Sequence, residues 1–195
     1  MTGKVTTEKD KPIESRKLLV RISLTALFAA LIAAGAFFVI PVGPVPIVLQ
    51  NLFALLSGLI LGPVLGAAAV ALYLFTGILG FPVFAGGTGG LARLAGPTGG
   101  YLVGYLFAAI IAGLIAGQPK ARTPLPRIVI AVIAGFLAVY VPGVTWLKVS
   151  QNLDWARSLA VGFTPFIVGD VLKGIAAVII APRLRRIAAS HLDKP

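Results

Sequence analysis

Apolar runs of about twenty residues recur along the whole chain, and they decide what it can fold into. Hydrophobic residues make up 58% of the sequence and charged residues 12%, whereas soluble domains carry about 25% charged residues. A helix needs about 20 mostly apolar residues to cross hydrocarbon, where every backbone N–H and C=O must be bonded within the segment. The sequence therefore predicts an all-α integral membrane protein.

The runs predict six transmembrane helices, with ends uncertain by a few residues. They lie at residues 20–40, 46–62, 63–81, 99–117, 128–147 and 161–181. We accordingly divide the chain into a polar N-terminal segment (1–19), a six-helix transmembrane domain (20–182) and a basic tail (183–195). The head is too long and too mixed in charge for the n-region of a signal peptide, so we expect the first span to be an anchor.

The distribution of basic residues predicts that both termini are cytoplasmic. With the N-terminus inside, thirteen Lys and Arg fall on the cytoplasmic side, and only Arg93, Lys148 and Arg157 fall outside. This is the asymmetry of the positive-inside rule, and cytoplasmic ends require an even number of spans. The net charge of +11 is then explained by topology and anionic membrane lipid, so we expect no nucleic-acid partner.

Two predicted outer connections are unusual and point to a cavity beneath them. In "IPVGPVPIVLQN" three prolines stiffen residues 41–46 into a lid or wall. In "GFPVFAGGTGGLARLAGPTGGYLVG" many glycines alternate with apolar side chains, which is typical of backbone folded onto the bundle with positive φ angles. Non-helical backbone at membrane depth is tolerated where it is buried in protein or lines a cavity.

One aspartate and one lysine interrupt the apolar sixth span, in "FIVGDVLKGIAAVII". If that helix begins near Val161, Asp170 lies about 13 Å below the outer edge, and Lys173 lies on the same face of the helix and can pair with it. Charges at this depth are costly, so both should face the bundle interior or a wet cavity. A ligand with hydrogen-bond donors and a negative charge would suit them, and a structural ion pair is the alternative. Gln50 and Asn51 are candidates for the same cavity or for interhelical hydrogen bonds.

Other classes of function lack the residues that they need. The chain has no cysteine and one histidine, which leaves no metal cluster and no nucleophile–base arrangement, so we expect no cofactor and no enzyme. The glycines near Gly99 are not followed by the lysine of a phosphate loop. An ion-coupled secondary transporter is disfavoured because no inverted repeats are visible.

The chain resembles the BioY family, the biotin-specific S components of energy-coupling factor (ECF) transporters. The resemblance covers about residues 24–182. It is carried by "PVPIVLQNLFALLSGLILGPVLGA" (44–67), "YLFTGILGFPVFAGGTGGLARLAGPTGGYLVGY" (73–105) and "GDVLKG" (169–174).

The resemblance implies a six-helix S-component bundle that binds biotin in a pocket open to the outside. Asp170 and Lys173 match the ligand-contacting positions of the sixth helix, with Asp170 at the ureido ring and Lys173 either beside Asp170 or at the ligand carboxylate. Gln50, Thr98 and Tyr101 match motif positions near the pocket. Arg93 matches no motif; its charge and location make it a second candidate for the carboxylate, and an interfacial arginine that faces solvent is the alternative.

The resemblance also implies partners in a prokaryotic inner membrane: a transmembrane coupling subunit and two ATPase subunits. S components offer small residues of the first helix to the coupling subunit, and Ala26, Ala30 and Ala34 lie on one face here. Small residues at this spacing let two helices approach closely, although internal packing is an alternative. Two alternative functions remain: a self-sufficient biotin carrier, and an S component for another small vitamin. An integral-membrane enzyme that uses Asp170 as a base is the least favoured alternative.

Overall fold

The computed structural model describes residues 11–120 and 122–192 and is helical apart from one two-stranded hairpin. The elements in chain order are α1 (Lys11–Gly35), β1 (Val39–Ile40), β2 (Ile47–Val48), α2 (Gln50–Leu61), α3 (Pro63–Ile78), α4 (Leu91–Ala95), α5 (Gly99–Ala116), α6 (Leu125–Ser150), α7 (Trp155–Gly162), the 3₁₀ turn η1 (Thr164–Phe166) and α8 (Ile167–Leu192). Three basic residues used to predict the orientation, Lys4, Lys9 and Lys194, lie outside the described residues, as does most of the predicted segment 1–19.

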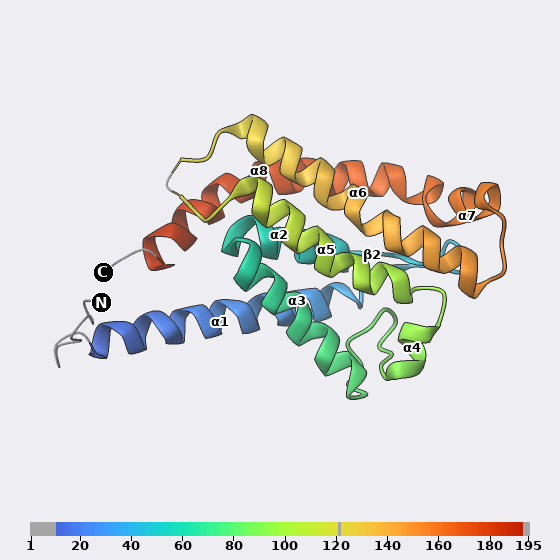
Figure 1. Ribbon diagram of the computed structural model, residues 1–195, viewed down its shortest axis with the longest axis horizontal. Helices are drawn as coiled ribbons and strands as arrows, with labels where there is room; N and C mark the ends of the chain where they lie inside the picture. Colours follow the sequence, from blue (N-terminus) through green and yellow to red (C-terminus); the bar gives the residue numbers. More distant parts are fainter. Residues whose placement is uncertain (1–10, 121, 193–195) are drawn as a thin grey trace, which may run out of the picture.

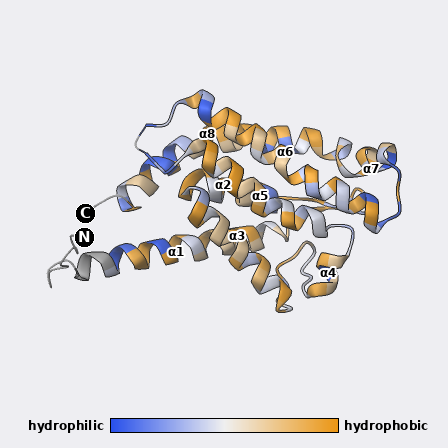
Figure 2. Cartoon of the chain, in the orientation of Figure 1, coloured by the Kyte–Doolittle hydropathy of each residue, from blue (hydrophilic) through white to orange (hydrophobic). Residues whose placement is uncertain are grey.

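The long helices run along one axis of the bundle (Figure 1). The first turns of α1 and the last turns of α8 lie at one end, while α4, α7 and the β hairpin lie toward the other. Apolar residues colour the helices along most of their length, and hydrophilic residues gather toward the ends (Figure 2). Large apolar side chains such as Ile133, Leu137 and Val171 are exposed on this surface, as expected where lipid replaces water.

Four of the described helical stretches are long and apolar enough to cross a membrane: Ser15–Gly35, Gly99–Ala116, Leu125–Ser150 and Trp155–Leu192. The last of these comprises α7, η1 and α8. Helices α2 and α3 are apolar but shorter, with 12 and 16 residues. Gly62 separates them at φ +84°, which confirms the predicted turn between "LIL" and Pro63.

Four predicted helix boundaries are wrong by five residues or more: α1 begins at Lys11 rather than 20, α8 continues to Leu192 rather than 181, and prolines explain the other two. The first helix ends at Gly35 rather than at residue 40, because Pro41 favours an extended conformation for Ile40, which pairs in the β hairpin instead. The predicted span 161–181 is interrupted, because Pro165 disfavours helix at Thr164, and α8 begins at Ile167. Asp170 therefore lies in the first turn of α8, and the depth counted from an unbroken helix starting at Val161 does not hold.

Helix α5 packs against α2, α3 and α6, and glycines make the close contacts. A Cβ at Gly58 of α2 would lie 2.0 Å from the carbonyl oxygen of Ala109 in α5. A Cβ at Gly104 of α5 would lie 2.6 Å from the carbonyl oxygen of Val139 in α6. Both values are far below van der Waals contact, so the backbones can approach only because these positions carry no side chain.

The two outer connections fold onto the bundle as the sequence predicts. The first forms the antiparallel β1–β2 pair, Val39 with Val48 and Ile40 with Ile47. The second contains α4 and uses positive φ at Gly80, Gly86, Gly87 and Gly90. It is anchored by Phe84, which is fully buried edge-on against Tyr73 at a centroid distance of 5.6 Å.

The contact at Gly58 predicts that Gly58→Ala destabilises the protein. The added methyl has no room against the α5 backbone, and overpacking of this kind costs about 1–3 kcal/mol. That loss should exceed the gain of about 1 kcal/mol in helix propensity that Ala offers over Gly. Thermal unfolding of the detergent-purified protein is the measurement.

The matched control is Gly169→Ala in α8, where the nearest atom to the new Cβ is Ile47 Cγ2 at 3.8 Å. This variant should be at least as stable as the parent protein, because no clash offsets the gain in helix propensity. Equal stability of the two alanine variants would contradict the close approach of α2 and α5.

Candidate ligand-binding site

A narrow cavity lies beneath the two outer connections, with about 530 Å³ of empty space when crevices and mouth are counted. Residues of α2, α5, α6 and α8 form its walls together with Val45, Pro46, Phe84 and Ala85 of the connections. Five of the six predicted binding residues line it: Gln50, Arg93, Thr98, Tyr101 and Lys173. The sixth, Asp170, contacts the cavity-lining Lys173 directly.

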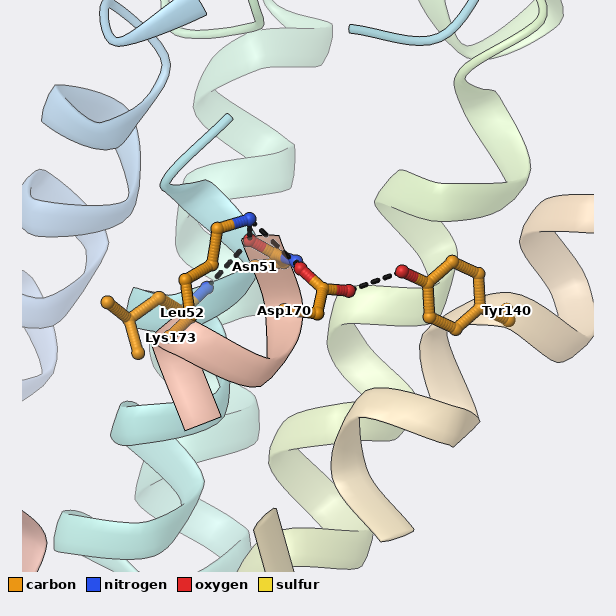
Figure 3. A network of polar contacts seen from close by, with 5 residues as sticks. All are labelled: Asn51, Leu52, Tyr140, Asp170 and Lys173. Atoms are coloured by element: carbon orange, nitrogen blue, oxygen red, sulfur yellow. Dashed lines mark hydrogen bonds and ion pairs between the residues drawn. The ribbon is translucent and has the colours of Figure 1, made fainter. Parts of the chain in front are cut away.

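Asp170 and Lys173 form the predicted ion pair and share a third partner, Asn51 (Figure 3). Lys173 Nζ lies 3.0 Å from Asp170 Oδ1 and 2.9 Å from Asn51 Oδ1, while Asn51 Nδ2 donates to Asp170 Oδ1 at 2.9 Å. All three residues are buried, each with 8% of its surface exposed. The triangle joins the first turn of α2 to the first turns of α8 and satisfies charges that would be costly alone.

The second carboxylate oxygen of Asp170 is bonded by another helix. The hydroxyl of Tyr140 in α6 donates to Asp170 Oδ2, and Figure 3 shows its ring on the far side of the carboxylate from Asn51 and Lys173. Asp170 thus connects α2, α6 and α8, while three of the roughly four lone-pair sites of its carboxylate are filled.

The amide nitrogen of Gln50 and the hydroxyl of Tyr101 are bonded within the protein. The Gln50 amide nitrogen donates to the hydroxyl of Tyr73 and, at 3.2 Å, to the carbonyl oxygen of Val83 in the second outer connection. The Tyr101 hydroxyl donates to the carbonyl oxygen of Gly162 at 2.7 Å. Gln50 therefore holds a connection in place, and Tyr101 can offer the cavity its ring.

Arg93 and Thr98 differ, because their hydrogen-bonding groups are incompletely used among the described residues. Arg93 Nη2 makes one long bond of 3.4 Å to the carbonyl oxygen of Ala85, and its buried Nε has no partner. Thr98 precedes α5, and its hydroxyl makes no bond to that helix's first turn. Arg93 lines the cavity and keeps a buried donor without a partner among the described residues, which suits an anionic ligand group.

The predicted coupling residues lie away from the cavity. Ala26, Ala30 and Ala34 of α1 are all exposed, and no described residue of α1 lines the cavity. Internal packing of α1 uses other residues, among them Phe28, Ala29 and Ile32, which are buried. The three alanines thus form a smooth strip on the bundle surface.

The sequence prediction missed one member of the site, Tyr140, and left Asn51 open between the cavity and interhelical hydrogen bonds. Asn51 carried a signal, a carboxamide inside an apolar helix, and its bonds to Asp170 and Lys173 are indeed interhelical. Tyr140 carried none, because one tyrosine in "GFLAVYVPG" is equally compatible with lipid, core or cavity. Only the approach of α6 to α8 reveals its role.

Comparison with known proteins points to one family. A profile of the BioY family matches residues 6–190. The chain is 43% identical to the "Probable biotin transporter BioY" of Pyrococcus horikoshii, covering 84% of this chain and 95% of that protein. It is 40% identical to the "Biotin transporter BioY" of Thermotoga maritima, covering 83% and 93% respectively.

A solved structure agrees with the sequence matches. The crystal structure of the S-component for biotin from an ECF-type ABC transporter superposes with a TM-score of 0.77 and 31% identity, covering 93% of this chain and 95% of that one. The chain has the fold of an ECF S component, and it belongs to the BioY family.

Proposed function

We propose that this protein is the biotin-binding S component of an ECF-type transporter, a multi-pass protein of a prokaryotic membrane that takes up biotin. Family membership and the S-component fold support this function. The observation that carries it here is a cavity lined on one side by a buried amide and ammonium, both bonded to the Asp170 carboxylate, and elsewhere by an incompletely bonded guanidinium. Biotin offers a ureido group, an apolar ring and chain, and a carboxylate to such a cavity.

The ureido ring is assigned to the Asp170 side of the cavity. Its N–H groups are donors, and Asp170 Oδ2 retains one lone-pair site beside the Tyr140 bond. Lys173 stays with Asp170 and Asn51, which keeps the buried aspartate compensated. Tyr101, Val48 and Phe166 supply apolar wall for the rings. Because the cavity is narrow, a ligand of this size enters only if the walls widen.

The ligand carboxylate is assigned to Arg93, with Thr98 and its hydroxyl nearby. The unpartnered Nε of Arg93 gives a carboxylate a charge-assisted bond that the empty site lacks. Lys173 is the weaker candidate, since it already pairs with Asp170 at 3.0 Å. Gln50 contributes indirectly, through the Val83 carbonyl of the second connection.

The topology we propose is six membrane crossings with both ends in the cytoplasm: a polar segment (1–19), the binding domain (20–182) and a basic tail (183–195). Helices α2 and α3 would form the second and third crossings despite their length. The start of α1 and the end of α8 lie at the same end of the bundle (Figure 1), which supports an even number of crossings.

The partners we propose are one transmembrane coupling subunit and two ATPase subunits, together with membrane lipid. The exposed Ala26, Ala30 and Ala34 strip of α1 is assigned to the coupling subunit. As a transporter component of its family the protein is not an enzyme.

A self-sufficient carrier would differ by importing biotin without ATPases, which uptake in cells lacking the coupling module would reveal. An S component for another vitamin would bind that vitamin more tightly than biotin in a displacement assay.

The first prediction is that the purified protein binds labelled biotin without partners, and that Asp170→Asn weakens this binding tenfold or more, about 1.4 kcal/mol. The substituted side chain is neutral. It therefore lacks the negative charge that attracts the ureido N–H groups and that pairs with Lys173. Asp154→Asn is the matched control, since Asp154 caps α7 by accepting from the Arg157 backbone N–H and should leave affinity unchanged. Failure of the folded parent protein to bind biotin would refute the ligand assignment.

The second prediction separates Arg93 from Lys173 at the carboxylate. Arg93→Gln should weaken binding of biotin tenfold or more, because hydrogen bonds to charged groups contribute about 1.5–3 kcal/mol. It should hardly change binding of biotin amide, whose side chain ends in a neutral group. Titration calorimetry with both ligands is the measurement, and Arg157→Gln is the control. An equal loss for both ligands would mean that Arg93 does not meet the carboxylate.

The third prediction concerns coupling. Ala30→Leu should leave biotin affinity unchanged but lower co-purification with the coupling subunit and biotin uptake by at least tenfold, because the larger side chain prevents close helix approach. Ala160→Leu, at an exposed alanine of α7, should alter neither. If the Ala30→Leu protein assembles and takes up biotin normally, this face of α1 does not contact the coupling subunit.

A further inference from the structure

Asp170 lies between two spaces that differ in character. Lys173 and Asn51, its partners at Oδ1, line the ligand cavity. Asp170 itself lines a separate groove between α6 and α8, with about 1120 Å³ of empty space. Tyr140 is the one described residue that lines both the cavity and the groove.

The groove between α6 and α8 is apolar and faces outward. Its walls include Ile133, Leu137, Ile175 and Ile179, each more than half exposed. Asp170 and Tyr140 are the polar exceptions among the described residues that line it. In a membrane this groove is in contact with hydrocarbon, where an unpartnered carboxylate oxygen would be strongly disfavoured.

The two oxygens of Asp170 are held differently. Oδ1 has two partners, Asn51 and Lys173, on α2 and α8. Oδ2 has only Tyr140 among the described residues. The Tyr140 ring is itself fixed, edge-on to Phe163 at 4.7 Å and to Tyr101 at 6.4 Å. Rotation of the carboxylate is therefore prevented on one side by α2 and α8 and on the other by the hydroxyl from α6 (Figure 3).

We propose that Tyr140, which lines both spaces, is a positioning residue for ligand recognition: its hydroxyl holds the Asp170 carboxylate at the boundary between groove and cavity, where a ligand reaches it when the cavity widens, and it shields Oδ2 from lipid. This inference rests on the proposed function, because it assigns the ligand's N–H group to the oxygen that Tyr140 holds. Tyr140 determines affinity through Asp170 and makes no polar contact of its own with the ligand.

The test is a double-mutant cycle of Tyr140→Phe and Asp170→Asn, read by equilibrium biotin binding in detergent. Phenylalanine keeps the ring contacts with Phe163 and Tyr101 and removes the hydroxyl alone. In the parent protein Tyr140→Phe should weaken biotin binding about tenfold, and in the Asp170→Asn background it should cause no further loss, because the two changes remove one shared interaction. Equal losses in both backgrounds, or no loss in the parent, overturn the proposal.

Tyr101→Phe is the comparison, since it removes a cavity hydroxyl bonded to the Gly162 carbonyl rather than to Asp170. Its effect should be the same in both backgrounds. If it couples to Asp170→Asn as strongly as Tyr140→Phe does, the coupling reflects general loosening of the cavity and the proposal fails. The binding of biotin by the parent protein is measured first, so that failure of the proposed function is distinguished from failure of this inference.

An infrared measurement on the ligand-free protein tests the Tyr140–Asp170 hydrogen bond directly. The carboxylate band of Asp170 is identified by its loss in Asp170→Asn. Because a carboxylate vibration responds to its hydrogen bonds, the band should shift in Tyr140→Phe and stay in place in Tyr101→Phe. An unshifted band in Tyr140→Phe contradicts the assigned bond.

Discussion

The buried triangle of Asp170, Lys173 and Asn51 is the interaction on which the rest of the site depends. Two unlike charges inside an apolar bundle rarely stabilise it more than apolar packing would, since each loses its hydration. Asn51 makes the arrangement tolerable by donating to the carboxylate and accepting from the ammonium at 2.9 Å each. A buried polar network with several bonds between helices favours one arrangement of them, and here it sets the position of α2 relative to α8.

A second polar contact acts at the opposite end of α2. Arg185 of α8 is 1% exposed, and its guanidinium donates to the carbonyl oxygens of Leu59 at the end of α2 and of Ala116, Gly117 and Gln118 at the end of α5. Carbonyls at helix ends lack partners within the helix and favour cations. Helix α8 therefore holds the 12-residue α2 at both ends, by Asn51 at its start and by Leu59 near its end, which compensates for its short length.

The sequence predicted those features that depend on residue type and local backbone chemistry. Apolar length located α5 almost to the residue, Gly62–Pro63 located the turn between α2 and α3, and the three-residue spacing predicted the Asp170–Lys173 pair. Features that depend on tertiary approach were not predictable in this way. The bond from Tyr140 to Asp170 needs α6 beside α8, and the break before Ile167 was hidden because apolar residues continue through it.

The ligand cavity and the proposed coupling surface share no helix, yet backbone bonds join them. Helix α1 ends where both outer connections attach: the Gly35 carbonyl accepts from the Leu49 N–H at 3.2 Å, and the Ala36 carbonyl accepts from the Gly86 N–H at 3.2 Å. A Cβ at Gly35 would also lie 2.9 Å from the Gln50 nitrogen, so α1 and α2 touch there. Because the connections that cover the cavity are bonded at the end of the helix that carries Ala26, Ala30 and Ala34, any movement of the connections would act on α1 at Gly35 and Ala36.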